Sequence, residues 1–212
     1  MKIKKIGHCC LVIETKNKKI MTDPGIFTIE KHTEEKNIDL ILITHEHADH
    51  FHIESLKKVL SENPQAVIFT NDGVGKLLRE SGIKYEVLKD KTPKDFFGVE
   101  IEPHDCKHEE IFQDFKQVLN TGYFIDKRLF YPGDSFYNPH REIEILALPV
   151  AGSWTRIKDA IEYAIQIKPK VCFPVHEEML KYAGTEHELP GFELAVFNID
   201  FKSFLGSAEE EF

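Results

Sequence analysis

The segment 44–50, with the sequence Thr-His-Glu-His-Ala-Asp-His, constrains this chain more than any other. It holds three histidines and one aspartate within six residues, namely His45, His47, Asp49 and His50. The apolar run Leu-Ile-Leu-Ile at 40–43 comes directly before it and predicts a buried strand. Imidazole and carboxylate together favour zinc, iron or manganese over calcium or magnesium. The segment therefore predicts a metal site where this strand ends.

Length and composition predict one compact domain over residues 1–212. No run approaches the ~18 apolar residues of a membrane span. The first residues carry charge but no apolar segment typical of a secretory signal, so we expect a cytoplasmic protein without membrane attachment. A net charge of −9 without a basic patch disfavours a nucleic-acid partner. The four cysteines form no CxxC pair, and we expect free thiols.

Apolar periodicity predicts an alternation of strands and helices in the first half of the chain. The expected strands are 9–15, 19–22, 39–43, 66–70 and 85–88, and the expected helices are 52–62 and 73–81. In the second half we expect strands at 97–102, 122–125, 129–131, 145–150, 171–175 and 193–197, and helices at 155–167 and 177–183. Asp72 is expected to cap the helix at 73–81, and Ser153 or Thr155 the helix at 155–167. The acidic tail 207–212 is expected to fray.

Further polar side chains follow strands of the second half. His108 comes after 97–102, Asp134 after 129–131, and His176 directly after 171–175. Open sheets place ligand sites at the carboxyl ends of their strands. These residues are therefore candidates to complete the site that 44–50 begins.

The motifs together resemble the metallo-β-lactamase-fold hydrolase superfamily. They are His-x-His-x-Asp-His after a hydrophobic strand, Gly-Asp at 133–134, and a histidine that ends a late strand. The opening Gly-His-Cys-Cys at 7–10, followed by Thr-Asp-Pro at 22–24, is similar to the small lactonase-like and phosphodiesterase-like branch. The resemblance spans roughly residues 6 to 184. It implies an α+β fold, a four-layer αββα sandwich of two mixed sheets, with the site at one edge between the two halves.

The resemblance implies two metal sites that share one carboxylate. The seven implied ligands are His45, His47, Asp49, His50, His108, Asp134 and His176. His45, His47 and His108 would hold one ion, and Asp49, His50 and His176 the other. Asp134 would bridge the two ions. His104 is the alternative to His108, and we prefer His108 because the family tends to have this ligand at the start of a loop.

Three more residues are expected near the ligands. Asp23 matches an early aspartate of the family that orients the metal ligands and does not itself bind metal. His8 matches a position that lines the pocket, although a histidine of the core is the alternative. Trp154 follows the strand at 145–150 and is expected either to wall the pocket or to belong to the core.

The implied activity is metal-dependent hydrolysis. Two divalent ions, zinc in the first place and manganese or iron as alternatives, would supply hydroxide as the nucleophile, and Asp49 would orient it. We expect the substrate to be an ester, lactone or phosphodiester of a small molecule. Histidine at position 47 and aspartate at 134 favour hydrolysis, since oxygen-reducing relatives usually have glutamate at the former position and secreted β-lactamases cysteine at the latter. The alternatives are a nuclease or nucleotide phosphodiesterase, and a metal-binding module without activity; the oligomeric state is not predicted.

Overall fold

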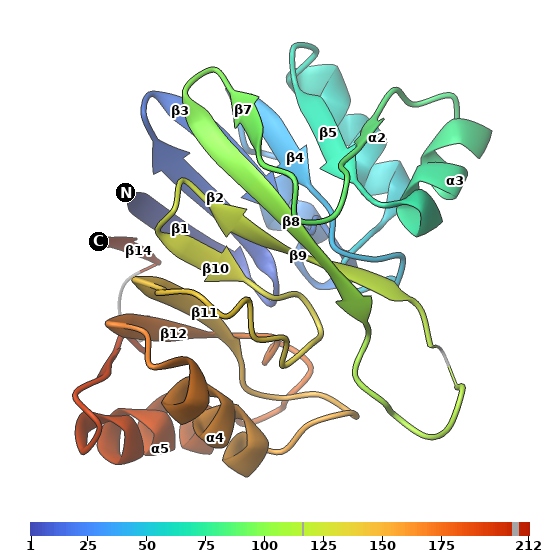
Figure 1. Ribbon diagram of the computed structural model, residues 1–212. Coiled ribbons are helices and arrows are strands. Elements are labelled where there is room, and N and C mark those ends of the chain that lie inside the picture. The colour runs from blue at the N-terminus through green and yellow to red at the C-terminus, as the bar shows by residue number, and fades with distance from the viewer. Residues whose placement is uncertain (116, 205–207) are drawn as a thin grey trace.

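Two seven-stranded sheets lie face to face in the computed structural model, which describes residues 1–115, 117–204 and 208–212 (Figure 1). The first sheet, in spatial order, contains β14 (Glu209–Glu211), β1 (Lys2–Gly7), β2 (Cys10–Thr15), β3 (Lys18–Thr22), β4 (Leu40–Leu42), β5 (Val67–Thr70) and β6 (Glu86–Val87). The second contains β13 (Asp200–Phe201), β12 (Val171–Val175), β11 (Ile145–Pro149), β10 (Leu129–Tyr131), β9 (Leu119–Ile125), β8 (Val99–Lys107) and β7 (Lys94–Phe96). Both sheets are mixed, as expected, because antiparallel pairs give way to parallel pairs from β3 to β4 and from β10 to β11.

Helices cover the outer faces of both sheets. The described helical segments are η1 (Ile26–Thr28), α1 (Ile29–His32), α2 (Ile53–Glu62), α3 (Asp72–Glu80), α4 (Ile157–Ile167) and α5 (Gly184–Ala195). Apolar residues of α2 and α3 pack on the first sheet, and those of α4 and α5 on the second (Figure 1). Within the part of the chain that the structure describes, no helix has both the length and the apolar content that a membrane-spanning segment requires.

The strand β4 shows why its sequence is apolar throughout. Leu40 and Leu42 point into the cluster between the sheets, whereas Ile41 points into the cluster beneath α2 and α3. Successive side chains of a strand alternate between the two faces, and here both faces are covered. On β11, Ala147 faces the inner cluster and Leu146 faces α4 for the same reason. This layering confirms the predicted α+β fold with αββα layers.

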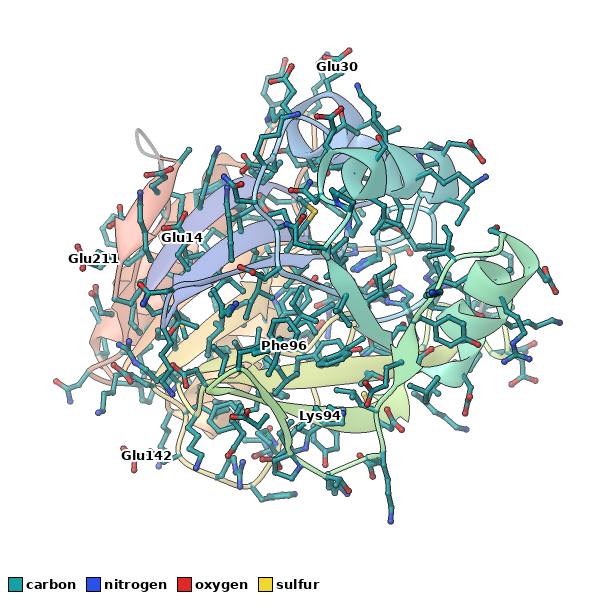
Figure 2. All side chains as sticks on the ribbon, turned by 90° about the horizontal axis from the view of Figure 1, so that it is seen from above. Glu14, Glu30, Lys94, Phe96, Glu142 and Glu211 are labelled. Carbon is teal, nitrogen blue, oxygen red and sulfur yellow. The ribbon has the colours of Figure 1, made fainter. Side chains whose placement is uncertain are left out.

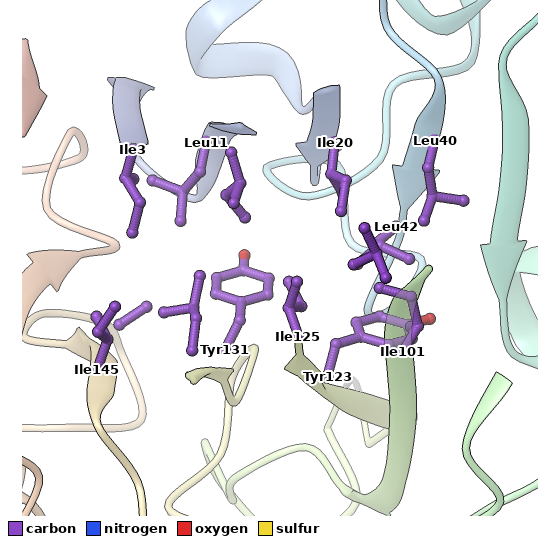
Figure 3. Packing of buried hydrophobic residues seen from close by; sticks show 14 of the residues in the cluster. Ile3, Leu11, Ile20, Leu40, Leu42, Ile101, Tyr123, Ile125, Tyr131 and Ile145 are labelled. Carbon is purple, nitrogen blue, oxygen red and sulfur yellow. The ribbon is translucent and has the colours of Figure 1, made fainter. Parts of the chain in front are cut away.

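Tyrosines join the two sheets inside the central core (Figure 3). The hydroxyl of Tyr123 on β9 donates to the backbone oxygen of Ile43, at a distance of 3.0 Å. The hydroxyl of Tyr131 on β10 donates to Oδ2 of Asp23 at 2.6 Å and lies 3.1 Å from the backbone oxygen of Cys9. Both side chains are fully buried, so each hydroxyl needs such a partner. Charged side chains such as Glu30 and Glu142 extend outward instead (Figure 2).

The segment after β12 differs from the prediction. Residues 177–183 are not helical, and the strand expected at 193–197 is wrong, because α5 spans most of that region. Pro190 and two glycines lie within α5 and obscure its helical pattern in the sequence. Lys5 of β1 pairs with Glu177 and holds the chain in a turn where a helix was expected.

The C-terminal tail is also ordered where it is described. Residues 205–207 lie outside the described residues, but β14 pairs with β1, so the expected fraying is wrong for the last strand. Lys2 lies opposite Glu211 in this register and its Nζ is 2.6 Å from a carboxylate oxygen of Glu209. Opposite charges across neighbouring strands stabilise such pairing, and a prediction from local sequence does not detect them.

Two helix caps differ from the prediction by one or more residues. The side chain of Asn71, not Asp72, accepts the hydrogen bond from the backbone N–H of Val74 at the start of α3. Arg156 precedes α4, and its backbone N–H donates to Asp159 at 3.1 Å in place of a cap by Ser153 or Thr155. Both helices nevertheless occupy nearly the predicted spans.

We expect Leu40→Ala to lower the free energy of unfolding by about 2–5 kcal/mol, because it would leave a cavity between the sheets. Leu40 is fully buried. Leu77→Ala on α3 is the matched control, since Leu77 is 36% exposed, and its effect should be clearly smaller. Urea unfolding of both variants measures the difference. Equal losses would contradict the assignment of Leu40 to the central core.

Candidate metal centre

Residues that follow the ends of four strands form the candidate metal centre. The segment 45–50 follows β4, while His108, Asp134 and His176 follow β8, β10 and β12. The strands belong to both sheets, so the centre lies between the two halves of the chain. The structure brings together all seven residues that the sequence predicted as ligands.

Three histidines form the first group of donor atoms. One ring nitrogen of each of His45, His47 and His108 lies within 4.8 Å of the others. Nδ1 of His108 lies 2.6 Å from the backbone oxygen of Glu109 and donates to it, which leaves Nε2 facing the group. Burial lowers the pKa of His45 well below its usual value, and that of His47 less strongly. Neutral imidazole is the form that binds metal.

The structure distinguishes His108 from its alternative. His104 lies within β8, where its ring contacts those of Phe130 and Tyr137 at centroid distances of 5.7 and 5.6 Å. Its Nε2 is 3.3 Å from a carboxylate oxygen of Glu102, away from the donor groups. Only His108 of the two shares a donor group with His45 among the described residues.

Asp49, His50, Asp134 and His176 form the second group. Nε2 of His176 lies 2.9 Å from Oδ2 of Asp134 and 3.4 Å from Oδ2 of Asp49. Nε2 of His50 lies 3.1 Å from Oδ1 of Asp134. The atoms of four side chains thus converge on a common point.

Asp134 connects the two groups. Its Oδ2 lies 3.2 Å from Nε2 of His108 in the first group as well as beside His176 in the second. The indole N–H of Trp154 donates to the same oxygen at 3.0 Å. Burial would raise the pKa of Asp134, but the charges of His176 and His50 outweigh burial and hold that pKa well below its usual value. The carboxylate is therefore ionised and placed between the two groups.

Several buried donor atoms lack the partners that burial normally requires. Nε2 of His50, Nε2 of His176 and Oδ1 of Asp134 are buried and make no hydrogen bond. Burial would lower the pKa of His50 and of His176, yet the charge of Asp134 raises both well above the usual value. The carboxylates therefore attract positive charge at this point, and a bound cation would supply it. The donor set fits two divalent metal ions.

Asp23 orients one of these histidines, as the resemblance implied. Its Oδ2 accepts from Nδ1 of His50 at 2.7 Å, from the hydroxyl of Tyr131 at 2.6 Å, and from the hydroxyl of Thr44 at 2.7 Å. Its Oδ1 accepts from the backbone N–H of Thr44 at 2.8 Å. Because Nδ1 of His50 is occupied, Nε2 faces the second donor group.

The remaining two predicted residues lie on different sides of the centre. Nε2 of His8 is 3.3 Å from Oδ2 of Asp49, and burial lowers the pKa of His8 to about 4. Trp154 lines the cleft above the donor groups, so it walls the pocket and does not belong to the core. His8 therefore contacts Asp49 but is not among the residues that line the cleft.

A cleft of about 290 Å³ opens over both groups. Its lining residues are Ile26, Phe27, His47, Ala48, Asp49, His108, Ile111, Asp134, Ser153, Trp154, His176 and Met179. A larger depression of about 380 Å³ beside Lys5 and His187 contains none of the seven donor residues. The smaller cleft is therefore the one that gives access to the metal centre.

Sequence reasoning missed residues that shape the centre through their backbone. A Cβ on Gly25 would lie 1.8 Å from the backbone oxygen of Asp49, so only glycine lets the two loops pack. Gly133 has a φ of +64°, and a Cβ there would lie 2.3 Å from Oδ1 of Asn120. Gly25 has no signal of its own in the sequence, and Gly133 is noticed there only as the neighbour of Asp134.

Lys5 is a further missed residue and has no local sequence signal. Its ammonium group donates to the backbone oxygen of Pro174 at 2.7 Å and pairs with Glu177, on either side of His176. Both side chains of this ion pair are 7% exposed. His176 has a φ of 72°, which is unfavourable for a residue with a side chain, and the anchored neighbours hold it there.

Comparison with known proteins agrees with this fold. A family model described as the beta-lactamase superfamily domain matches residues 2–176. A UPF0173 protein of Pyrococcus abyssi is 31% identical over 191 residues, which cover 83% of each chain. A UPF0173 metal-dependent hydrolase of Thermoplasma volcanium is 28% identical over 183 residues, or 80% of each chain.

A solved structure shows the same arrangement. A candidate metal-dependent hydrolase from Parabacteroides distasonis has a TM-score of 0.77 and 25% identity, and the match covers 95% of this chain and 91% of that one. The family match spans most of the chain and includes all seven donor residues. The chain therefore belongs to the β-lactamase superfamily and is a metal-dependent hydrolase with the metallo-β-lactamase fold.

Proposed function

We propose that this protein is a two-metal hydrolase that cleaves an ester, lactone or phosphodiester of a small molecule. One observation carries the proposal: two groups of buried donor atoms meet at the single carboxylate of Asp134. His45, His47 and His108 would hold one ion. Asp49, His50 and His176 would hold the other, and Asp134 would contact both. Zinc is the first candidate, with manganese and iron as alternatives for the same donors.

When bound, the two ions would lower the pKa of water and draw electron density from the bond to be cleaved. The protein side chains would position the reaction. Oδ2 of Asp49 faces the second donor group, and the side chain is 23% exposed to the cleft. It is the group placed to accept a hydrogen bond from the attacking water and to orient it. His8 holds Asp49 through its Nε2, which lies 3.3 Å away.

Metal removal tests the proposed function as a whole. The purified protein should contain about two divalent ions per chain and hydrolyse at least one member of an ester, lactone and phosphodiester panel. A chelator should abolish the activity, and zinc or manganese should restore it, because imidazoles and carboxylates are ligands that suit these ions. Metal analysis and kinetics before and after chelation measure this. A loaded protein that hydrolyses nothing in the panel would contradict the proposal.

We expect His108→Ala to reduce the bound metal from about two ions per chain to about one, because the first group would keep only two histidines. His104→Ala is the matched control: it removes the same side chain from the same strand region. That variant should keep both ions. Metal content by elemental analysis separates the two variants. Full occupancy in His108→Ala would show that His108 is not a ligand.

Asp23→Asn should weaken metal binding about 10- to 100-fold, because the amide group cannot orient His50 as the carboxylate does. Tyr131→Phe removes one donor to Asp23 but keeps the buried ring, so we expect a smaller effect of the same sign. Competition with a chromogenic chelator measures both affinities. Wild-type affinity in Asp23→Asn would rule out an orienting role for Asp23.

A further inference from the structure

We propose that the cleft selects esters or lactones that carry a short apolar acyl group over those with a charged acyl group. This inference rests on the proposed hydrolase activity and narrows its substrate class. It follows from the composition of the cleft walls, from how those walls are held, and from the cleft's volume.

The walls of the cleft are apolar above a polar floor. Ile26 and Phe27 of η1 and Met179 after β12 are 42%, 44% and 40% exposed, and all three line the cleft. Ile111 comes from a different loop, and Trp154 from the segment before α4. Five large apolar side chains from four segments thus surround the entrance to the donor groups. Such a surface binds an apolar part of a ligand while the polar floor fixes the reacting group.

Contacts of the metal centre hold the same walls in place. The backbone N–H of Ile26 donates to the backbone oxygen of Ala48 at 2.9 Å, within the ligand segment. The ring of Phe27 lies 4.8 Å from that of His8, and Trp154 is fixed by its bond to Asp134. The walls are therefore positioned before a substrate enters, and little ordering is needed when it binds.

The walls of the cleft offer no lysine or arginine to a charged acyl group. Among the described residues that line the cleft neither residue type occurs. Four basic residues lie near the lining in sequence but are not part of it. Lys31 donates to the backbone oxygen of Ile6 at 3.3 Å, Arg156 pairs with Asp159 at 2.7 Å, and Lys107 and Lys181 are exposed. Removing a charged group from water without a partner is costly. A carboxylate on the acyl group, held against these walls, is therefore disfavoured.

The volume limits the apolar group to a few carbon atoms. At about 290 Å³, the cleft lies near the lower end of small-molecule sites, which begin at about 300 Å³. In the inferred reaction, water adds its oxygen to the acyl carbon, the carbon–oxygen bond to the alcohol breaks, and the alcohol leaves with a proton. The products are an alcohol and a carboxylic acid, which releases the second proton of the water and becomes a carboxylate.

Four chromogenic substrates with one leaving group test this selectivity on the zinc-loaded protein. They are p-nitrophenyl acetate, p-nitrophenyl butyrate, the p-nitrophenyl monoester of succinic acid, and bis(p-nitrophenyl) phosphate. We expect kcat/KM to rise about fourfold for each added methylene from acetate to butyrate. The succinate ester has the length of the butyrate but ends in a carboxylate, and it should react at least about tenfold more slowly. The phosphodiester carries no acyl group and serves as a substrate for the underlying hydrolase proposal alone.

A charged wall should reverse the preference. Met179→Lys places a cation beside the acyl group, so the ratio of butyrate to succinate ester should fall by about tenfold or more. Val87→Lys on β6 is the matched control, because Val87 is 39% exposed and lies outside the cleft, and its ratio should stay unchanged. An unchanged ratio in Met179→Lys would overturn the role of this wall.

The possible outcomes distinguish a failure of this inference from a failure of the proposed hydrolase function. Hydrolysis of the succinate ester as fast as the butyrate or faster would overturn the inference and leave the hydrolase proposal intact. Hydrolysis of none of the four substrates, nor of any compound in the wider panel, would overturn both. A butyrate preference that is lost in Met179→Lys and kept in Val87→Lys would support the inference.

Discussion

The buried carboxylate of Asp23 is the contact on which the structure of the site depends. It is fully buried and would be costly to ionise there without partners. The donors come from both sheets: Thr44 follows β4, and Tyr131 ends β10. Its third partner, His50, belongs to the metal centre. One charged group thus connects the packing of the two sheets with the direction in which a ligand faces.

This arrangement explains how three strained turns persist at the centre. His8, Asp23 and His176 all have positive φ angles, which cost residues other than glycine on the order of 1–3 kcal/mol each. Each of them follows the end of a strand, and its side chain contacts or belongs to the donor groups. The cross-sheet hydrogen bond of Tyr131 and the Lys5–Glu177 ion pair stabilise these turns.

The sequence could predict which residues come together at the candidate metal centre because their chemistry is local and their positions are regular. His45, Asp134 and His176 each come after an apolar strand, and the ends of strands in a layered fold meet at one edge. The resemblance supplied their grouping and the preference for His108. The structure then placed His108 beside His45 and left His104 within β8.

What the sequence could not predict depends on contacts between distant segments. In the sequence, Lys5 has no feature that distinguishes it from a surface lysine. In the structure β1 lies beside the turn after β12, and Lys5 pairs there with Glu177. The need for Gly25 is visible only once the backbone of Asp49 lies against it. The helix α5 was not predicted for another reason. Pro190 and two glycines interrupt its helical sequence pattern, whereas the packing of Leu194 in the core stabilises the helix. Local propensity and tertiary packing disagree at that point, and packing prevails.

The centre divides its tasks between two kinds of structure. The donor atoms follow strand ends that both sheets hold rigidly, whereas the cleft walls come from η1, from the loop at 111 and from the turn at 179. Surface loops accept substitutions that a buried ligand set does not. The same metal chemistry can therefore serve different substrates when only the walls change. In this chain the walls are apolar and carry no lysine or arginine among the described lining residues, and the proposed preference for an uncharged acyl group rests on these walls.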